Sequence, residues 1–406
     1  MTKDNKVVIT GMNIISSLGL GLRENWENMV AGKSGVSQIT LFDTSGLETQ
    51  IAAQVPDSFE EFAATKVKKR KSSQMTRVTR MSFVCAKDAV EQESIDFENF
   101  DKSRVAVILG VVNTGNSSVE DTQESRNSIL KGMNNAMSAW ISMQYSLTGP
   151  SYTVATACSS SAYAIGLGYD LIKSGRADMV ITGGADSTIN PEEIAGFNQL
   201  FALSTQNDQP TKACKPFSEN RDGFVIGEGA GIMILESEEF AKKRKATIYG
   251  EIAGYALTTE GYNIMAPKKD GEGMAETMEK ALIDSGVEKS EVDYISAHGT
   301  STTLNDLYET MAIKKVFGDR ASSIAISSQK SMIGHTIGAA GVIEGIVTVL
   351  SIKNNILTPT INLDQPDPDM DLDFVPNVSR GAEIRVALSN SFAFGGHNAT
   401  LVFRKY

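Results

Sequence analysis

The sequence has few of the residues that crosslink secreted proteins or bind metals, since 406 residues include three cysteines and three histidines. The odd, sparse set of cysteines (Cys85, Cys158 and Cys214) favours a reduced, cytoplasmic protein with at least one free thiol. No Cys-x-x-Cys or His-Glu-x-x-His spacing occurs, which argues against a metal site. The sequence also lacks a Gly-x-Gly-x-x-Gly fingerprint and a phosphate loop, so we expect no nucleotide cofactor.

Long apolar runs and excess basic charge are absent too. The longest clean apolar run, 105–112, is too short to span a membrane, and the N-terminus lacks the pattern of a signal peptide. The net charge is -11, from 38 basic and 49 acidic residues, which disfavours non-specific nucleic-acid binding. A length of 406 residues allows two to three domains of about 150 residues each. The hydrophobic content of 41% is typical of a globular protein.

Strand-like and helix-like runs alternate along the chain, which predicts an α/β fold with mostly parallel sheets. The runs 105–109 and 179–182 are typical of buried strands, and 159–173 has helical spacing and ends at Ser174-Gly175. PFSENRDGFVIGEGAGIMILE near residue 217 and NSFAFGGHNATLVF near the end both place Phe and paired glycines before an apolar strand. We therefore expect two similar halves, 1–245 and 246–406, although glycine before a strand is common in any α/β protein.

The segment ATACSSSA (155–162) predicts a reactive cysteine. A strand-like stretch meets a helix at Cys158, which places the thiol beside the free N–H groups and the positive end of the helix dipole. Both features lower the pKa of a thiol, and the N–H of Cys158 itself can stabilise an oxyanion. The alternative is a buried structural cysteine, the usual state of a free thiol.

Two further motifs place histidines after strand-like runs, where sites in α/β proteins collect. HGTSTTLND (298–306) offers His298, and KSMIGHTIGAAG (330–341) brings Lys330 and His335 onto one loop. Because its neighbours would bury Lys330, we expect a carboxylate partner for it, either Glu309 or Glu344.

The last motif, NSFAFGGHN (390–398), predicts a tight turn at Gly395-Gly396, where a backbone N–H could be a second oxyanion donor. We interpret His397 as structural, since nothing near it resembles an acid–base partner. One cysteine and two histidines fit acyl chemistry. A hydrolase needs one histidine as base with an orienting acid, whereas two neutral imidazoles could hydrogen-bond to a thioester carbonyl while an enolate develops.

These motifs, in this order and together with PFSENRDGFVIGEGAG (216–231), resemble the elongating β-ketoacyl-acyl-carrier-protein synthases. Similar proteins are the condensing enzymes of type II fatty-acid synthesis and the catalytic ketosynthase subunits of type II polyketide synthesis. The resemblance extends from 7 to 403 and implies a thiolase fold, with two similar βαβαβ halves in five αβαβα layers, usually dimeric. The reaction it implies is decarboxylation of malonyl-carrier protein and attack of the carbanion on a cysteine-bound acyl thioester.

The resemblance also implies a role for each motif residue. Cys158 accepts the acyl chain, His298 and His335 hold the malonyl thioester, and Lys330 organises the site. Phe394 is the gating aromatic, and its N–H joins that of Cys158 in the oxyanion hole. The remaining assignments are Thr300 and Thr302 to the pantetheine arm, Asn113 and Phe392 to substrate binding, and Asp306, Glu309 and Glu344 to support.

Three relatives are disfavoured. The non-catalytic chain-length partner of polyketide systems lacks the cysteine that Cys158 retains. Biosynthetic thiolases use a second, late cysteine, and none follows Cys214, while the initiating synthases have asparagine where His335 stands. Two positions depart from the family pattern. Ala393 stands where the fatty-acid enzymes usually have glycine, so we expect the gate to open differently, and Asn113 suits an oxygenated or unsaturated chain unless it points elsewhere. The form of HGTSTTLNDLYET is nearer to the polyketide relatives and slightly favours polyketide synthesis.

A basic cluster in this acidic chain is a candidate docking surface, because carrier proteins are strongly acidic. It comprises Lys66, Lys68, Lys69, Arg70 and Lys71, with Arg77 and Arg80 beyond, and the alternative is a solvated helix face. The expected partners are an acyl carrier protein and a second subunit, identical or a cysteine-less homologue. Two other functions stay open: an acyl-thioester hydrolase using Cys158 and His298, and a non-catalytic partner of an active ketosynthase.

Overall fold

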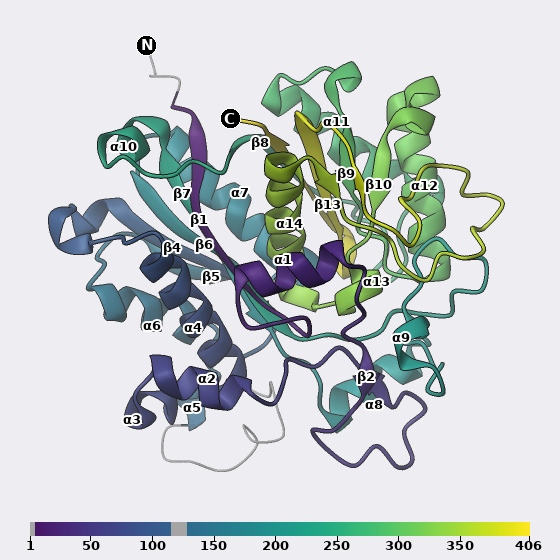
Figure 1. Ribbon diagram of the computed structural model, residues 1–406, viewed down its shortest axis with the longest axis horizontal. Coiled ribbons are helices and arrows are strands. Elements are labelled where there is room, and N and C mark those ends of the chain that lie inside the picture. The colour runs from purple at the N-terminus through teal and green to yellow at the C-terminus, as the bar shows by residue number, and fades with distance from the viewer. Residues whose placement is uncertain (1–4, 115–127) are drawn as a thin grey trace.

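The computed structural model describes residues 5–114 and 128–406, and its main feature is a ten-stranded sheet (Figure 1). The strands contributed by the first half of the chain are β1 (Val7–Ile15), β4 (Val105–Gly110), β5 (Ser151–Val154), β6 (Met179–Asp186) and β7 (Gly229–Ser237). Those contributed by the second half are β8 (Gly250–Thr259), β9 (Tyr294–Ser296), β10 (Ala325–Ser327), β13 (Val386–Phe392) and β14 (His397–Arg404). Two small sheets pair β2 (Ser37–Gln38) with β3 (Ile51–Ala52) and β11 (Ile356–Leu357) with β12 (Arg380–Gly381).

The two sets of five strands have the same topology. When the strands of each half are numbered 1 to 5 along the chain, both half-sheets have the order 3-2-4-5-1. The directions also agree: strands 3, 2 and 4 are parallel neighbours, and strand 5 is antiparallel to strands 4 and 1. A short antiparallel pairing of β1 with β8 joins the half-sheets. This confirms the expectation of two similar halves, whereas the boundary between 1–245 and 246–406 stays a prediction.

The expectation of mostly parallel sheets holds for four of the five strands in each half, but the fifth strand is antiparallel, so each half-sheet is mixed. In the second half, β13 and β14 are joined by the short turn 393–396. A turn of this length can connect only antiparallel neighbours, whereas parallel strands need a long crossover. The alternation of strands and helices correctly indicated the fold class but not the direction of the last strand in each half.

The helices cover the half-sheets on both sides. Those before residue 245 are α1 (Leu22–Val30), α2 (Phe59–Lys66), α3 (Lys69–Ser72), α4 (Arg77–Gln92), α5 (Ser128–Gly132), α6 (Ala136–Tyr145), α7 (Ser160–Lys173), α8 (Pro191–Gln199), α9 (Pro210–Ala213) and α10 (Glu238–Lys243). Those after it are α11 (Glu272–Ser285), α12 (Thr303–Phe317), α13 (Lys330–Ile333) and α14 (Ala340–Asn354).

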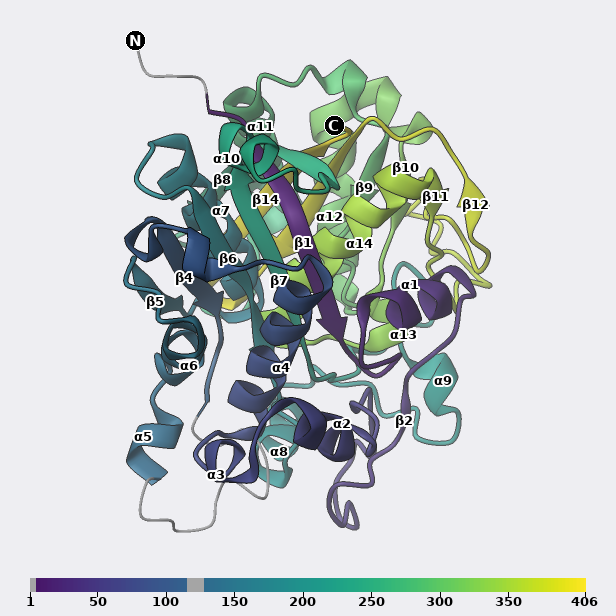
Figure 2. The same ribbon diagram turned by 60° about the vertical axis from the view of Figure 1, so that its left-hand side comes forward.

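Three hydrophobic clusters define five layers (Figures 1 and 2). One outer cluster packs α4 and α6 on the first half-sheet, and the other packs α11 and α12 on the second. The central cluster contains α7 and α14, which lie between the two half-sheets and contact strands of both. The arrangement is the αβαβα stack of a thiolase fold.

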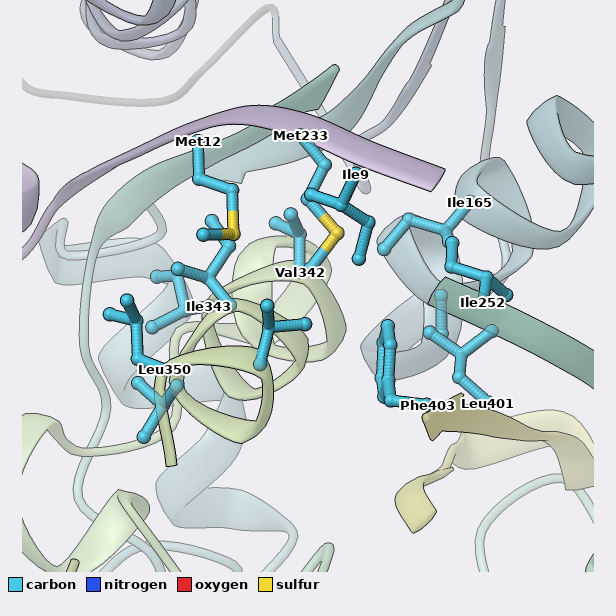
Figure 3. Packing of buried hydrophobic residues seen from close by; sticks show 14 of the residues in the cluster. Ile9, Met12, Ile165, Met233, Ile252, Val342, Ile343, Leu350, Leu401 and Phe403 are labelled. Atoms are coloured by element: carbon cyan, nitrogen blue, oxygen red, sulfur yellow. The ribbon is translucent and has the colours of Figure 1, made fainter. Parts of the chain in front are cut away.

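Helix α14 is apolar all round because it lies inside the stack. Its residues 340–352 are all buried, and Figure 3 shows Val342, Ile343 and Leu350 packed with residues of β1, β7 and β14. Burial of one such side chain contributes about 1.5–3 kcal/mol, so this helix is a large part of the core. The helical stretch Ile337–Asn354 is long and apolar enough to cross a membrane, but 89% of it is buried inside the protein.

Candidate active site

Cys158 lies where the sequence placed it, between a strand and a helix. Strand β5 is followed by a 3₁₀ turn (Ala157–Ser159), and α7 begins at Ser160. Ala157 has a left-handed backbone with φ 49°, which turns the chain sharply just before the thiol. Strand β4 passes so close to this turn that a Cβ on Gly110 would lie 2.3 Å from the carbonyl carbon of Ser160, so only glycine fits there.

The expected lowering of the Cys158 pKa is wrong. The thiol is 6% exposed, and its burial raises the pKa to about 12. The positive charge of Lys330 and hydrogen bonds from the N–H groups of Phe394 and of Cys158 itself oppose this rise, while the carboxyl of Asp186 adds to it. The thiol is therefore protonated at neutral pH, because loss of water outweighs the helix terminus.

This pKa predicts the pH dependence of alkylation. Between pH 7 and pH 9, the rate of Cys158 alkylation by iodoacetamide should rise about tenfold per pH unit, because the thiolate fraction grows with pH below the pKa. Intact-mass spectrometry, with Cys158→Ala to identify the site, measures the rate. A rate that levels off near pH 7.5 would instead show a thiol whose pKa the helix terminus has lowered.

Cys158 and both candidate histidines line one cavity of about 370 Å³. His298 follows β9, and His335 lies between α13 and α14, so the second half of the chain contributes both. Their rings lie 5.4 Å apart and nearly perpendicular. The cavity is also lined by the expected substrate-binding residues Thr300, Thr302 and Phe392 and by Phe394, the expected gating aromatic.

Hydrogen bonds fix the same tautomer in both imidazoles. Lys330 Nζ lies 3.3 Å from His298 Nδ1, and the N–H of Ile337 donates to His335 Nδ1 at 3.2 Å. Because both Nδ1 atoms accept, each Nε2 carries the proton and is the ring nitrogen left for the cavity. The site therefore offers two N–H donors, suited to an oxygen that gains negative charge during a reaction.

Both imidazoles are neutral at pH 7. Burial lowers the pKa of His298 and of His335 well below the ordinary value, and the positive charge of Lys330 lowers both further. A neutral imidazole donates a hydrogen bond without releasing a proton to the reaction. This agrees with the sequence-based expectation of neutral imidazoles.

Lys330 is fully buried, and its carboxylate partner is Glu344, with which it forms an ion pair across α13 and α14. The ammonium also donates to the carbonyl oxygen of His298 at 2.6 Å. Burial raises the pKa of Glu344 to about 7, against the effect of Lys330. Lys330 thereby holds the main chain and the ring of His298 together.

Glu309, the other candidate partner, does not pair with Lys330 in the described part of the chain. It accepts the N–H groups of His298 and Gly299 at 2.9 and 2.8 Å, so it holds the histidine loop through the main chain. Asp306 holds the next part of the same loop, because its carboxylate accepts hydrogen bonds from the N–H groups of Thr300 and Ser301. The two carboxylates in the first turns of α12 thus shape the loop that carries His298.

The turn at Phe394 has the predicted glycine conformation. Gly395 and Gly396 have φ values of 80° and 72°, which favour glycine. Ala393 has an extended backbone, φ -115° and ψ 157°, so alanine is unstrained in this conformation. The turn is also held from outside, because Gly395 N–H donates to the carbonyl of Ile264 at 2.7 Å.

Glu260, which lies behind this turn, was not expected from the sequence. Glu260 lines the cavity and accepts Asn398 Nδ2 at 3.0 Å and the N–H of Lys268 at 2.6 Å. The loop 260–268 thus fastens the Phe394 turn. Glu260 and Asn398 lie 138 positions apart. Asn398 ends the motif 390–398, but no local pattern marks Glu260 as part of a site.

Two expectations about individual residues have different outcomes. Asn113 is exposed and is not among the cavity-lining residues, whereas its neighbour Val112 is, so the polar acyl pocket is not supported. The N–H of Val112 is held by Asp186, and this sets which side chain faces inward. His397 lies outside the lining, half-buried with its ring edge-on to Tyr163, as a structural residue would be.

The basic cluster is only partly available for a partner. Lys66 pairs with Asp88 and Glu91, and Lys71 lies 4.2 Å above the Phe83 ring. Lys68, Lys69 and Arg70 are exposed at the start of α3, whereas Arg77 and Arg80 beyond them are buried and paired with Glu60. Three of the five residues therefore remain as a docking candidate.

The mouth of the cavity is apolar and exposed. Phe201 and Leu200 after α8, Met265 in the loop 260–268 and Leu304 in α12 line the cavity, yet are 45% to 88% exposed. Side chains of this kind on the surface mark a place where a partner or a ligand binds. The cavity is thus entered between three separate segments.

Comparison with known proteins gives two family matches that together cover most of the chain. The family described as Beta-ketoacyl synthase, N-terminal domain, matches residues 4–241, and Beta-ketoacyl synthase, C-terminal domain, matches residues 249–364. A relative from Coxiella burnetii, named 3-oxoacyl-[acyl-carrier-protein] synthase 2, is 41% identical over 98% of both chains. A protein of the same name from Staphylococcus aureus is 39% identical over the full length of both.

Solved structures with the same fold include ketosynthases of polyketide systems. The ketosynthase of AntDE:AntF, a type II polyketide ketosynthase in complex with its acyl-carrier protein, is 32% identical over the whole of both chains, with a TM-score of 0.91. The ishigamide ketosynthase/chain length factor is 33% identical over 99% of this chain and 100% of its own, also with a TM-score of 0.91.

Proposed function

The chain belongs to the β-ketoacyl synthase family and is a condensing enzyme of the acyltransferase class, and we propose that Cys158, His298 and His335 carry its reaction. The reaction is a decarboxylative condensation that forms β-ketoacyl-carrier protein in fatty-acid or polyketide synthesis. The observation that supports these roles is that the thiol and the two imidazoles line the same cavity. Because both Nδ1 atoms accept hydrogen bonds, each imidazole has an Nε2–H group to donate.

In the first half-reaction, Cys158 takes the acyl chain from its carrier. The sulfur bonds to the thioester carbonyl carbon, and the oxygen gains negative charge, which the N–H groups of Cys158 and Phe394 stabilise. The bond to the carrier sulfur then breaks, and the proton of Cys158 leaves with the carrier thiol. Because burial raises the pKa of Cys158, we propose that the thiol loses its proton during this step.

In the second half-reaction, malonyl-carrier enters beside the acylated cysteine. His298 and His335 donate from Nε2 to the thioester carbonyl, which stabilises the enolate formed as carbon dioxide leaves. The enolate carbon attacks the Cys158 thioester, a carbon–carbon bond forms, and the cysteine sulfur is released and takes up a proton. The product is two carbons longer than the acyl group.

The geometry disfavours the hydrolase alternative. A hydrolytic histidine needs a hydrogen-bond acceptor at its Nδ1, a carboxylate or an amide oxygen, to orient it as a base. In the described part of the chain, His298 Nδ1 faces an ammonium and His335 Nδ1 faces a backbone N–H. The non-catalytic alternative is disfavoured because Cys158 is present and reaches the cavity.

A reconstituted reaction tests the proposal. Incubation with malonyl-carrier and acyl-carrier primers should give a β-ketoacyl-carrier whose mass exceeds that of the primer by two carbons, two hydrogens and one oxygen, with one carbon dioxide released per condensation. The primer that reacts best distinguishes a fatty-acid from a polyketide pathway. The form of the 298–310 motif slightly favours the polyketide pathway. Free acid, with no carbon dioxide released, would establish the hydrolase instead.

We propose that an acyl carrier protein docks beside the cavity mouth and is steered there by Lys68, Lys69 and Arg70. Charge reversal of these three residues to Glu should lower kcat/KM for the acyl-carrier about tenfold at low salt, through the association rate, and change that for a small acyl thioester less than about twofold. Steady-state kinetics with both substrates measures the effect.

Reversal of Lys242, Lys243 and Lys245 to Glu is the control. It changes the net charge equally, and Figures 1 and 2 show α10 far from α3. Equal slowing of the carrier and the small thioester by the α3 variant, or equal slowing of the carrier by both variants, would refute this docking site.

We also propose a dimer, formed with an identical chain or with a cysteine-less homologue. Strand β5 is the outermost strand of the first half-sheet, so one of its edges is unpaired within the described chain, and its Tyr152 is 37% exposed.

The substrates arrive on the carrier's own phosphopantetheine, so no further cofactor is proposed. A cytoplasmic location accords with the free thiols.

A further inference from the structure

Asp186, the last residue of β6, is a fully buried carboxylate without a part in the reaction described above. Its partners are three backbone N–H groups: Ser187 at 2.9 Å, Val112 at 3.2 Å and Gly338 at 3.1 Å. No cation pairs with it among the described residues. A buried carboxylate is costly unless its hydrogen bonds are needed, so the two distant main-chain segments that it joins are informative.

One of these segments is the second-half copy of the nucleophile turn. Thr156-Ala157-Cys158 and Thr336-Ile337-Gly338 each lead through a 3₁₀ turn into a central helix, α7 or α14. Ala157 and Ile337 have nearly the same left-handed φ, 49° and 46°. In both turns the N–H three residues after the threonine donates to the threonine carbonyl, at 3.2 and 3.0 Å. Gly338 therefore corresponds to Cys158, and Asp186 supplies the oxygen that accepts its N–H.

The turn held in this way determines the tautomer of a histidine. The N–H of Ile337 is the group that donates to His335 Nδ1. A β-branched residue rarely adopts a left-handed backbone, so the surroundings must hold Ile337 in it. The contact to the next N–H, that of Gly338, is made by Asp186.

We propose that Asp186 is a positioning residue for His335: its carboxylate holds the Ile337–Gly338 turn so that the Ile337 N–H keeps the proton of His335 on Nε2. Through Val112, the same carboxylate ties the wall of the cavity to this turn. The inference rests on the proposed function for its effect on catalysis, but the tautomer itself can be measured without any substrate.

Nitrogen-15 NMR of histidine-labelled protein tests the inference, because the chain contains only three histidines and His335→Ala assigns the relevant signals. In the wild type, His335 should show an unprotonated Nδ1. In Asp186→Ala, His335 should become a mixture of tautomers. Asp186→Asn, whose amide oxygen can still accept from Val112 and Gly338, should retain the single tautomer.

A second variant reaches the same contact from the other side. A Cβ on Gly338 would lie 2.7 Å from Asp186 Oδ2, so Gly338→Ala should displace the carboxylate and give the same mixture of tautomers. In the double variant Asp186→Ala/Gly338→Ala, the two effects should not add, because the first change removes the group that the second displaces. Gly338→Ala decides the question if Asp186→Ala does not fold.

The half-reactions separate positioning from general support of the fold. Malonyl-carrier decarboxylation should fall at least about tenfold in Asp186→Ala, while acyl transfer to Cys158 changes less than about threefold. An unchanged His335 tautomer in both Asp186→Ala and Gly338→Ala would overturn the inference. Equal losses in the two half-reactions would overturn it too. If the wild type does not decarboxylate malonyl-carrier at all, the proposed function fails and the tautomers alone decide this inference.

Discussion

Replacement of Cys158 by alanine should abolish condensation, by at least about 10³-fold, because Cys158 is the only cysteine among the described residues that line the cavity. The variant should still decarboxylate malonyl-carrier, since His298, His335 and Lys330 do not depend on the thiol for their contacts. Intact-mass spectrometry after incubation with acyl-carrier should show one added acyl group in the wild type and none in Cys158→Ala.

Cys214 provides the matched control for this experiment. It is also buried, and burial raises its pKa to about 12 as well, yet it is not among the cavity-lining residues. Cys214→Ala should therefore keep full acylation and condensation. Acylation that persists in Cys158→Ala would refute the assignment of the nucleophile, and loss of acylation in Cys214→Ala would show that the assay reports on folding.

Removal of either imidazole should have the second-largest effect. In His298→Ala and in His335→Ala, we expect malonyl-carrier decarboxylation to fall about 10²- to 10³-fold, because each variant loses one hydrogen-bond donor to the developing enolate. Acyl transfer to Cys158 should change less than about threefold, because its oxyanion is stabilised by N–H groups of the main chain. Carbon dioxide release and acyl mass on the protein measure the two half-reactions separately.

His397→Ala is the control for both variants, because His397 is the third histidine and lies outside the cavity lining. Its half-reactions should stay within about twofold of the wild type. If His298→Ala and His335→Ala slowed both half-reactions equally, the imidazoles would serve the fold or the nucleophile and not the enolate.

The main parts of the site could be predicted from the sequence because each depends on a local pattern. Cys158 lies at a strand–helix junction, and His298 and Lys330 follow short strands, so the fold class alone indicated where these motifs would lie. The sequence left Glu309 and Glu344 as candidate partners of Lys330, because a buried ammonium needs a carboxylate nearby, and the structure shows that Glu344 is the partner. These are consequences of short segments and of simple electrostatics.

The parts that the sequence could not predict depend on distant contacts. The pKa of Cys158 follows from its burial in the folded cavity, which outweighs the local effect of the helix terminus. The loss of Lys66 from the docking surface depends on Asp88, 22 positions further along the chain. Asp186 bonds to Gly338 across 152 positions, and no periodicity indicates such a contact.

Helix α14 has a consequence for how the protein is made. The ribosome delivers α7 and the first half-sheet long before α14, which packs against both. Until then, the nascent chain exposes an apolar face that a chaperone would have to shield from aggregation. A premature stop before residue 340 would leave that face uncovered permanently, and a chain halted after α7 would carry the nucleophile without the histidines that complete the site.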